Sequence, residues 1–173
     1  MSTNYPNFDL CLEAKELGFP QARKSGAMYY VRPDMLISIE DLTYLRKDGY
    51  TDFEDIFNTL VFKPRLDDLS EASRSFFHEL IRLPAEEEMD EEGVKHIAAP
   101  ESFFAYSNVE DTQVSAEMEE GTTKRADKFI RERGKTEWEA RLKLFVHVKR
   151  QEKELSPPFD SETSDNQVKS VDI

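Results

Sequence analysis

The chain contains three histidines, the residue type best suited to proton transfer near neutral pH and to binding a transition metal. His78, His96 and His147 are far apart in the sequence, and none has a second ligand at the short spacing typical of a metal site. His78 and His147 fall on expected helices, where we interpret each as an ordinary helix residue. Only a fold that gathers all three would make a metal site, so we predict no metal and no cofactor.

The possible nucleophiles and acids have equally simple explanations. Cys11 is the single cysteine, which excludes an intramolecular disulfide and a multi-cysteine zinc site. It falls on the apolar face of an expected helix, so we interpret it as a small buried thiol. Neighbouring carboxylates at Asp67-Asp68 and Glu110-Asp111 fit helix capping and solvation. The sequence lacks a nucleophile elbow, a phosphate-binding glycine loop and a dinucleotide fingerprint, and we predict no catalytic residues and no enzyme activity.

One short stretch concentrates negative charge. The sequence "AEEEMDEEG" holds six carboxylates, which repel one another and predict a solvated loop or a frayed helix. Such a cluster is a candidate surface for a basic protein partner, or a mimic of nucleic-acid charge that occupies the basic groove of a nuclease. The candidate residues are Glu86, Glu87, Glu88, Asp90, Glu91 and Glu92.

Positive charge gathers near the C-terminus. Residues 122–153 hold 11 Lys and Arg against 5 Asp and Glu, although the whole chain has a net charge of −13. Internal charge complementarity and solvated faces are the ordinary explanation. The functional alternative is contact with nucleic-acid phosphates through basic helices, which would weaken steeply with salt. The candidate residues are Lys124, Arg125, Lys128, Arg131, Arg141 and Lys149.

The composition indicates a folded protein of one domain. A length of 173 residues with 12 Phe and 6 Tyr suffices for a buried core. We expect a flexible N-terminus at residues 1–6, a single domain at 7–155 and a disordered acidic and polar tail at 156–173. We find neither a secretory signal nor an apolar run long enough to cross a membrane, and we therefore expect a cytoplasmic protein without membrane contact.

The first third of the chain alternates helix and strand signals. Asn7 is placed to cap a helix from Phe8 that stops at Gly18, because Pro20 prevents its continuation. Strands at 27–31 and 35–39 would follow as a hairpin. Ser38 with Asp41 predicts the cap of a short helix through residue 47. Thr51 with Glu54 repeats that pattern, and residues 60–62 fit either a helix or a strand.

The remaining chain mixes helix signals with strand candidates. Three- and four-residue apolar spacing predicts a helix from Leu66 to Ile81, and residues 122–133 also read as a helix. Residues 94–106 remain undecided, and 109–118 fit a strand. Thr136 with Glu139 caps the clearest helix, in which Trp138 is the best core anchor. Without a βαβ rhythm, these elements predict an α+β fold with a small, mainly antiparallel sheet.

Two aromatic pairs stand within expected strands. Tyr29-Tyr30 and Phe103-Phe104 could stack on nucleic-acid bases or on another ligand. Core packing is the ordinary role of such rings, and we expect it here.

Several short motifs resemble small uncharacterised proteins encoded by tailed bacteriophages and prophages. The matching pieces are "GFPQ" after the first helix, "YYV" in the first strand, "FKPRLDDL", and the closing "GKTEWEARLKLFVHVK". The chain departs from that pattern by the insertion "MLISIEDLTYLRKDGYTDFEDIF" and by the acidic run. The resemblance implies a phage origin and an accessory role in the infected cytoplasm, with no catalytic residues to carry over.

These observations favour a non-enzymatic phage accessory protein that binds a host or phage protein. The alternatives are an acidic, nucleic-acid-mimicking inhibitor of a host defence nuclease, and nucleic-acid contact through the basic C-terminal helices.

Overall fold

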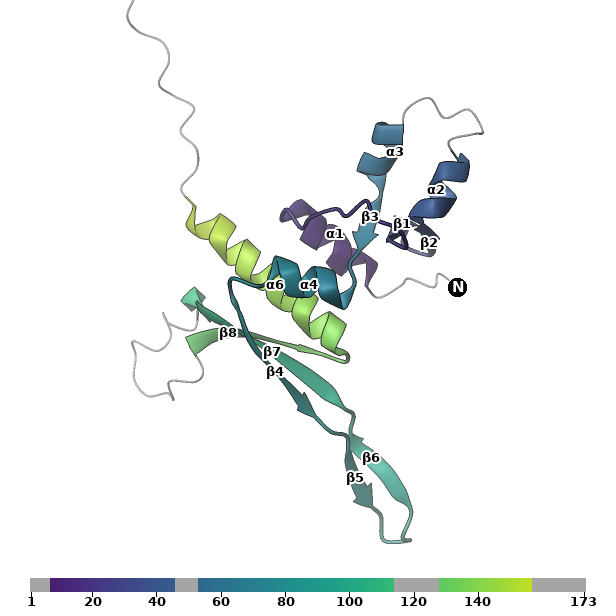
Figure 1. The fold of residues 1–173 in the computed structure, drawn as a ribbon. Coiled ribbons are helices and arrows are strands. Elements are labelled where there is room, and N and C mark those ends of the chain that lie inside the picture. The colour runs from purple at the N-terminus through teal and green to yellow at the C-terminus, as the bar shows by residue number, and fades with distance from the viewer. Residues whose placement is uncertain (1–6, 46–52, 114–127, 157–173) are drawn as a thin grey trace, which may run out of the picture.

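The computed structural model describes residues 7–45, 53–113 and 128–156, and Figure 1 shows its path. The elements of the described residues combine helices with small antiparallel sheets, which confirms the α+β class. In chain order they are α1 (Phe8–Glu16), β1 (Met28–Arg32), β2 (Met35–Ser38), α2 (Ile39–Leu45), α3 (Phe53–Thr59), β3 (Val61–Lys63), α4 (Leu66–Ala72), β4 (Phe77–Leu83), β5 (Glu86–Met89), β6 (Lys95–Ala99), β7 (Ser102–Glu110), β8 (Phe129–Gly134) and α6 (Glu137–Leu155).

The N-terminal part forms a sheet of order β2-β1-β3, as the predicted hairpin requires. Gly18 has φ of +87° after α1, which confirms the predicted helix stop. The amide of Asp41 donates to Ser38 Oγ at 3.2 Å, so the predicted cap of α2 is also confirmed. Asn7 precedes α1 but makes no side-chain cap bond, because its own backbone is already helical. Residues 61–63 are a strand, which settles that ambiguity.

Helix α6 lies at the centre of the molecule. One side packs on β7 and β8, and α1 and α4 pack against it from other directions (Figure 1). Thr136 Oγ1 accepts a hydrogen bond from the amide of Glu139 at 3.1 Å, which confirms the predicted cap. The Phe145 ring lies 4.8 Å from Phe19 and 6.2 Å from Phe76, so α6 joins the aromatic core to both halves of the chain.

The predicted aromatic anchors lie largely in this core. Tyr29 and Tyr30 are fully buried in β1, which confirms their packing role. Trp138 is half-buried against the core, and its Nε1 donates to the carbonyl of Pro64 at 2.6 Å. The two rings of the Phe103-Phe104 pair lie on opposite faces of their sheet, because neighbouring residues of a strand face opposite sides. Phe103 packs against the core, whereas the half-buried Phe104 faces the other side of its sheet.

The predicted helix from Leu66 to Ile81 is wrong beyond Ala72. Its second half is strand β4, which pairs antiparallel with β7. A bulge between Phe77 and Glu79 places Phe77 and Leu80 on the same face of the sheet, so two apolar residues three apart mimic helical spacing. The pairing strand lies far along the sequence, where local periodicity cannot detect it.

The predicted helix over residues 122–133 is also wrong where the structure describes it. Residues 129–134 form β8, in which buried Ile130 alternates with exposed Arg131 and Arg133. Residues 94–106 supply β6 and the start of β7. In the described part of the strand predicted over 109–118, β7 ends at Glu110 and residues 111–113 are not strand.

Some predictions lie outside the described residues. These are the flexible residues 1–6, the cap at Thr51, the ends of α2 and of the 109–118 strand, and the tail beyond residue 156. The single domain over residues 7–155 stays a prediction.

Candidate functional site

The acidic run forms part of a projecting β-hairpin. Strands β5 and β6 pair with each other antiparallel as a separate two-stranded sheet that extends away from α6 (Figure 1). Pro84 separates β5 from β4, and Pro100 separates β6 from β7. We call residues 84–101 the hairpin arm. The predicted loop or frayed helix is therefore wrong for residues 86–89, which form β5, whereas residues 90–92 lie in the connecting loop and the predicted exposure to solvent is correct.

A compact turn closes the hairpin arm. Asp90 Oδ1 accepts hydrogen bonds from the amides of Glu92 at 3.0 Å and Val94 at 2.8 Å. The Asp90 carbonyl accepts from the amide of Gly93 at 3.0 Å, and Gly93 has φ of +82°. This is the turn chemistry of Asp followed by a left-handed glycine. The turn connects β5 to β6 and so sets up their antiparallel pairing.

The hairpin arm has two different faces. Met89 pairs with Lys95 and Glu87 with Ile97, so these four side chains share one face. Met89 is 63% exposed and Ile97 is 65% exposed, while Lys95 Nζ lies 3.3 Å from Glu87 Oε2. The other face carries Glu88 beside His96, at 4.0 Å between Oε2 and Nε2. One face is therefore apolar with a single ion pair, and the other is acidic.

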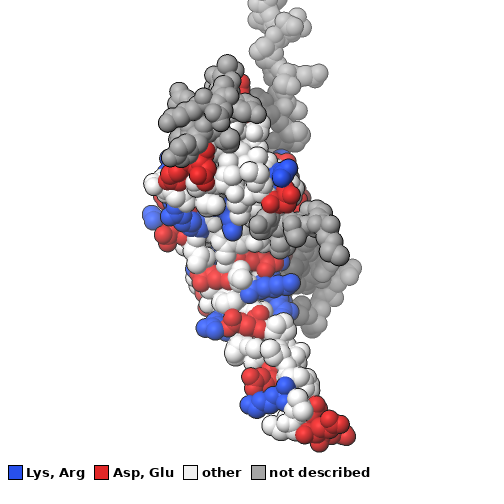
Figure 2. Space-filling view, turned by 90° about the vertical axis from the view of Figure 1, so that its right-hand side faces the viewer, with Lys and Arg blue, Asp and Glu red and all other residues white. Residues whose placement is uncertain are grey.

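Negative charge is concentrated at the end of the hairpin arm. Figure 2 shows Asp and Glu gathered at the tip, whereas both signs of charge alternate over the rest of that face. The structure thus brings all six predicted acidic residues onto one arm. Two of them have internal roles, since Asp90 builds the turn and Glu87 pairs with Lys95.

The four predicted basic residues that the structure describes do not form one surface. Lys128 Nζ lies 2.5 Å from Glu110, Arg141 Nε lies 2.8 Å from Glu137, and Lys149 Nζ lies 2.7 Å from Glu152. Arg141 also stands over the Phe77 ring at 4.1 Å. Arg141 and Lys149 on α6 form ion pairs with neighbouring side chains of the same helix. Arg131 belongs to β8 and lies on the face of the sheet away from α6. Lys124 and Arg125 lie outside the described residues.

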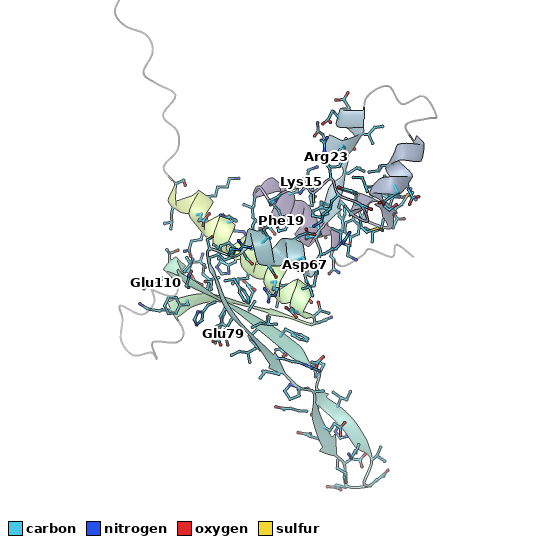
Figure 3. All side chains as sticks on the ribbon, in the orientation of Figure 1. Lys15, Phe19, Arg23, Asp67, Glu79 and Glu110 are labelled. Carbon is cyan, nitrogen blue, oxygen red and sulfur yellow. The ribbon has the colours of Figure 1, made fainter. Side chains whose placement is uncertain are left out.

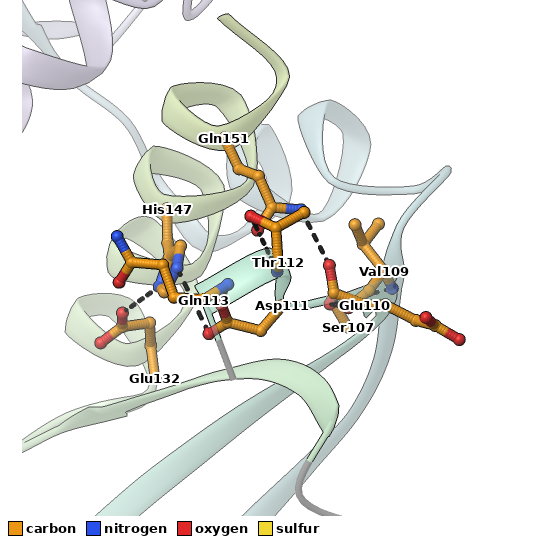
Figure 4. A network of polar contacts seen from close by, with 9 residues as sticks. All are labelled: Ser107, Val109, Glu110, Asp111, Thr112, Gln113, Glu132, His147 and Gln151. Carbon is orange, nitrogen blue, oxygen red and sulfur yellow. Dashed lines mark hydrogen bonds and ion pairs between the residues drawn. The ribbon is translucent and has the colours of Figure 1, made fainter. Parts of the chain in front are cut away.

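A polar network around His147 joins α6 to the ends of β7 and β8 (Figure 4). His147 Nδ1 lies 2.7 Å from Glu132 Oε1, and Nε2 lies 3.7 Å from Asp111 Oδ2. Both ring nitrogens therefore face carboxylates, so the His147 side chain connects α6 to β8 and to the residue that follows β7. A base that activates a nucleophile would instead direct one nitrogen toward a hydroxyl or a thiol.

Gln151 completes this network. Its Oε1 accepts hydrogen bonds from the amide and hydroxyl of Thr112, at 3.0 and 3.2 Å, and its Nε2 donates to the Glu110 carbonyl at 2.8 Å. The side chain is only 7% exposed, so these bonds satisfy a buried amide. Sequence reasoning missed Gln151, because nothing local distinguishes a buried glutamine from an exposed one on a polar helix.

The remaining sequence candidates are dispersed. His78 and His96 are exposed on strands β4 and β6, so His78 is not on a helix as predicted. Within residues 7–45, 53–113 and 128–156, no group of His, Cys, Asp or Glu could hold a metal ion. Cys11 is 2% exposed, and burial raises the pKa of its thiol to about 12, which confirms the buried-thiol interpretation.

None of the helices in the described part of the chain combines the length and apolar character needed to span a bilayer. Comparison with protein-family models, curated proteins and solved structures finds no match to this chain.

Proposed function

We propose that this protein is a non-enzymatic binding protein that engages a protein partner through the hairpin arm. The observation that carries the proposal is a projecting β-hairpin whose large apolar side chains face solvent. Met89, Val94 and Ile97 are each more than half exposed, at 63%, 57% and 65%. An isolated two-stranded hairpin is marginally stable in water, and a partner that covers apolar side chains would stabilise it.

The charges of the hairpin arm indicate the chemistry of that partner. Glu86 and Glu88 alternate with Glu87 and Met89 along β5, so carboxylates lie on the face of the arm opposite Met89, and Glu87 adds a carboxylate beside the apolar side chains. A matching surface would offer an apolar groove with a basic rim. Opposite charges at such a rim speed association and select the partner, more than they add affinity.

Capture experiments with matched variants test this proposal. The variant M89S/I97S removes the exposed apolar side chains of the arm. The control V31S/M35S removes two exposed apolar residues of the β1–β2 hairpin, at 43% and 41%. We expect wild type and control to capture the same partner from a host lysate, and M89S/I97S to lose it. Equal capture by all three proteins would contradict the proposal.

On the resemblance to phage and prophage proteins, we propose that the partner is a host or phage protein in the cytoplasm of an infected bacterium.

A second candidate function is inhibition of a host nuclease by charge mimicry, which the carboxylates at the tip favour (Figure 2). Reversal of Glu86, Glu91 and Glu92 to lysine would then abolish inhibition of that nuclease. M89S/I97S would leave such inhibition intact, because nucleic acid has no counterpart to these apolar side chains.

A further inference from the structure

The sheet of order β4-β7-β8 has a second face, on the side away from α6. Buried Ile130 and half-buried Glu132 turn toward α6, so the alternate residues of β8 turn away. Figure 3 shows Glu79 on that same outer side. Ile81 and Leu83 are 38% and 47% exposed there. By register, the outer face consists of Glu79, Ile81, Leu83, Ser102, Phe104, Tyr106, Glu110, Phe129, Arg131 and Arg133.

Two aromatic side chains and two arginines form parallel rows on this face. Phe104 and Tyr106 follow each other along β7, with ring centroids 6.5 Å apart. On β8, Arg133 is paired with Phe104 and Arg131 with Tyr106. The Arg133 guanidinium stands 5.6 Å from the centre of the Phe104 ring. Phe104 therefore has a cation beside its ring, and Arg131 lies opposite Tyr106 in the register, two residues before Arg133 in β8.

A hollow lies at the end of the aromatic row. The β4 bulge at His78 coincides with a break in the pairing of β7 and β8 between Tyr106 and Glu110. The two irregularities leave a space of about 290 Å³. Its lining is mainly apolar with a few polar groups, as is usual for small-molecule sites. The lining residues are His78, Glu79, Tyr106, Ser107, Asn108 and Phe129.

We propose that this face binds single-stranded nucleic acid. Bases would stack on Phe104 and Tyr106, with one base in the hollow beside Phe129, and phosphates would follow Arg131 and Arg133. Aromatic platforms beside a cationic track are the general means of binding single strands with little sequence preference. The opposite side of the aromatic row carries the carboxylate of Glu79, so the phosphates are directed to the β8 side.

Binding of fluorescently labelled dT12 at low salt, measured by anisotropy, tests the proposal. Tyr106→Leu keeps an apolar side chain but removes the stacking ring, and R131S/R133S removes the cations. We expect each change to raise Kd at least tenfold. The arginine variant should also flatten the dependence of affinity on salt. The control Arg32→Ser removes an arginine of 66% side-chain exposure from the β1–β2 hairpin and should bind like wild type.

Several results would overturn the proposal. These are no binding of dT12 by wild type, equal Kd values for wild type and both outer-face variants, and equal weakening by Arg32→Ser. Displacement of dT12 by polyglutamate at the same concentration of charge would indicate an acidic peptide instead. Thermal unfolding shows whether each variant folds. If one outer-face variant does not fold, the Kd of the other outer-face variant decides between the outcomes. M89S/I97S should bind dT12 normally, so this test is independent of the hairpin arm.

Discussion

Two glycines hold left-handed backbone at the ends of different elements. Gly18 ends α1, and Gly93 lies in the turn of the hairpin arm, with φ of +87° and +82°. No atom would contact an added Cβ at either position, so alanine would suffer from backbone strain alone, about 1 kcal/mol or more. We expect Gly18→Ala to lower Tm by about 2–4 °C for each kcal/mol of this strain, because α1 packs in the core.

Gly93→Ala should leave Tm unchanged and speed amide hydrogen exchange in residues 86–99, because the strain falls on a hairpin that lies outside the core. A fall in Tm as large as that of Gly18→Ala would show that the hairpin arm unfolds together with the core.

Glu40 links acid stability to the start of β1. Its Oε1 accepts hydrogen bonds from the Gly26 amide at 2.8 Å and the Ser25 hydroxyl at 2.9 Å, and these bonds lower the pKa of Glu40. A lowered pKa stabilises the fold above the unfolded value, and the effect disappears as pH falls through the folded value. Glu40→Gln should therefore have a lower Tm than wild type at neutral pH.

The difference in Tm between Glu40→Gln and wild type should narrow once pH falls below the ordinary glutamate pKa of about 4.3. Thermal unfolding by circular dichroism from pH 7 to pH 3 measures it, with Glu91→Gln on the hairpin arm as the control. A difference that stays constant with pH would show that the Glu40 charge is not its source.

At the scale of elements, the junction of β8 and α6 depends on Gly134. A Cβ at this position would lie 2.8 Å from the Thr136 carbonyl and would also clash with the backbone amide of Ala140. Backbone atoms of a capped helix cannot move aside easily. We expect Gly134→Ala to reduce the free energy of unfolding by about 1–3 kcal/mol in denaturant titrations. The neighbouring exposed change Lys135→Ala should stay within about 0.5 kcal/mol of wild type.

The elements that were predicted from sequence have their determinants within a few residues. Thr136 with Glu139, Ser38 with Asp41, and Gly18 after α1 each act on the adjacent turn, and each was identified correctly. Local patterns predict helix for β4 and β8, because their partner β7 lies far along the chain. For β5 the run of carboxylates predicts a loop or frayed helix, although its partner β6 follows after a short turn. The bulge in β4 added a misleading helical spacing.

The candidate site was only partly visible in the sequence. The run of carboxylates marked the correct segment, since charge clusters can be read from composition. The sequence does not identify Met89 and Ile97 as surface residues, because an isolated apolar residue has the same appearance in a core and on a projecting hairpin. The outer face of the β4-β7-β8 sheet depends on cross-strand register, which no local pattern specifies.

At the scale of the whole molecule, the hairpin arm should be dispensable for folding. Leu83 and Ser102 are paired in register, so replacement of residues 84–101 by Asn-Gly closes β4 and β7 with a two-residue turn. All residues of β5, and those of β6 before Ala99, are exposed. We expect Tm to change by no more than about 2 °C, while partner capture is lost. Loss of cooperative unfolding would contradict this expectation.

The two prolines at the base of the hairpin arm have a practical consequence. Pro84 and Pro100 lack amide hydrogens, and at this point the backbone ladder of the arm is discontinuous with that of the body. The segment between them carries its own turn, register and side-chain display. It is therefore a transplantable module, and insertion into the tight turn of an unrelated carrier protein should transfer its recognition properties intact.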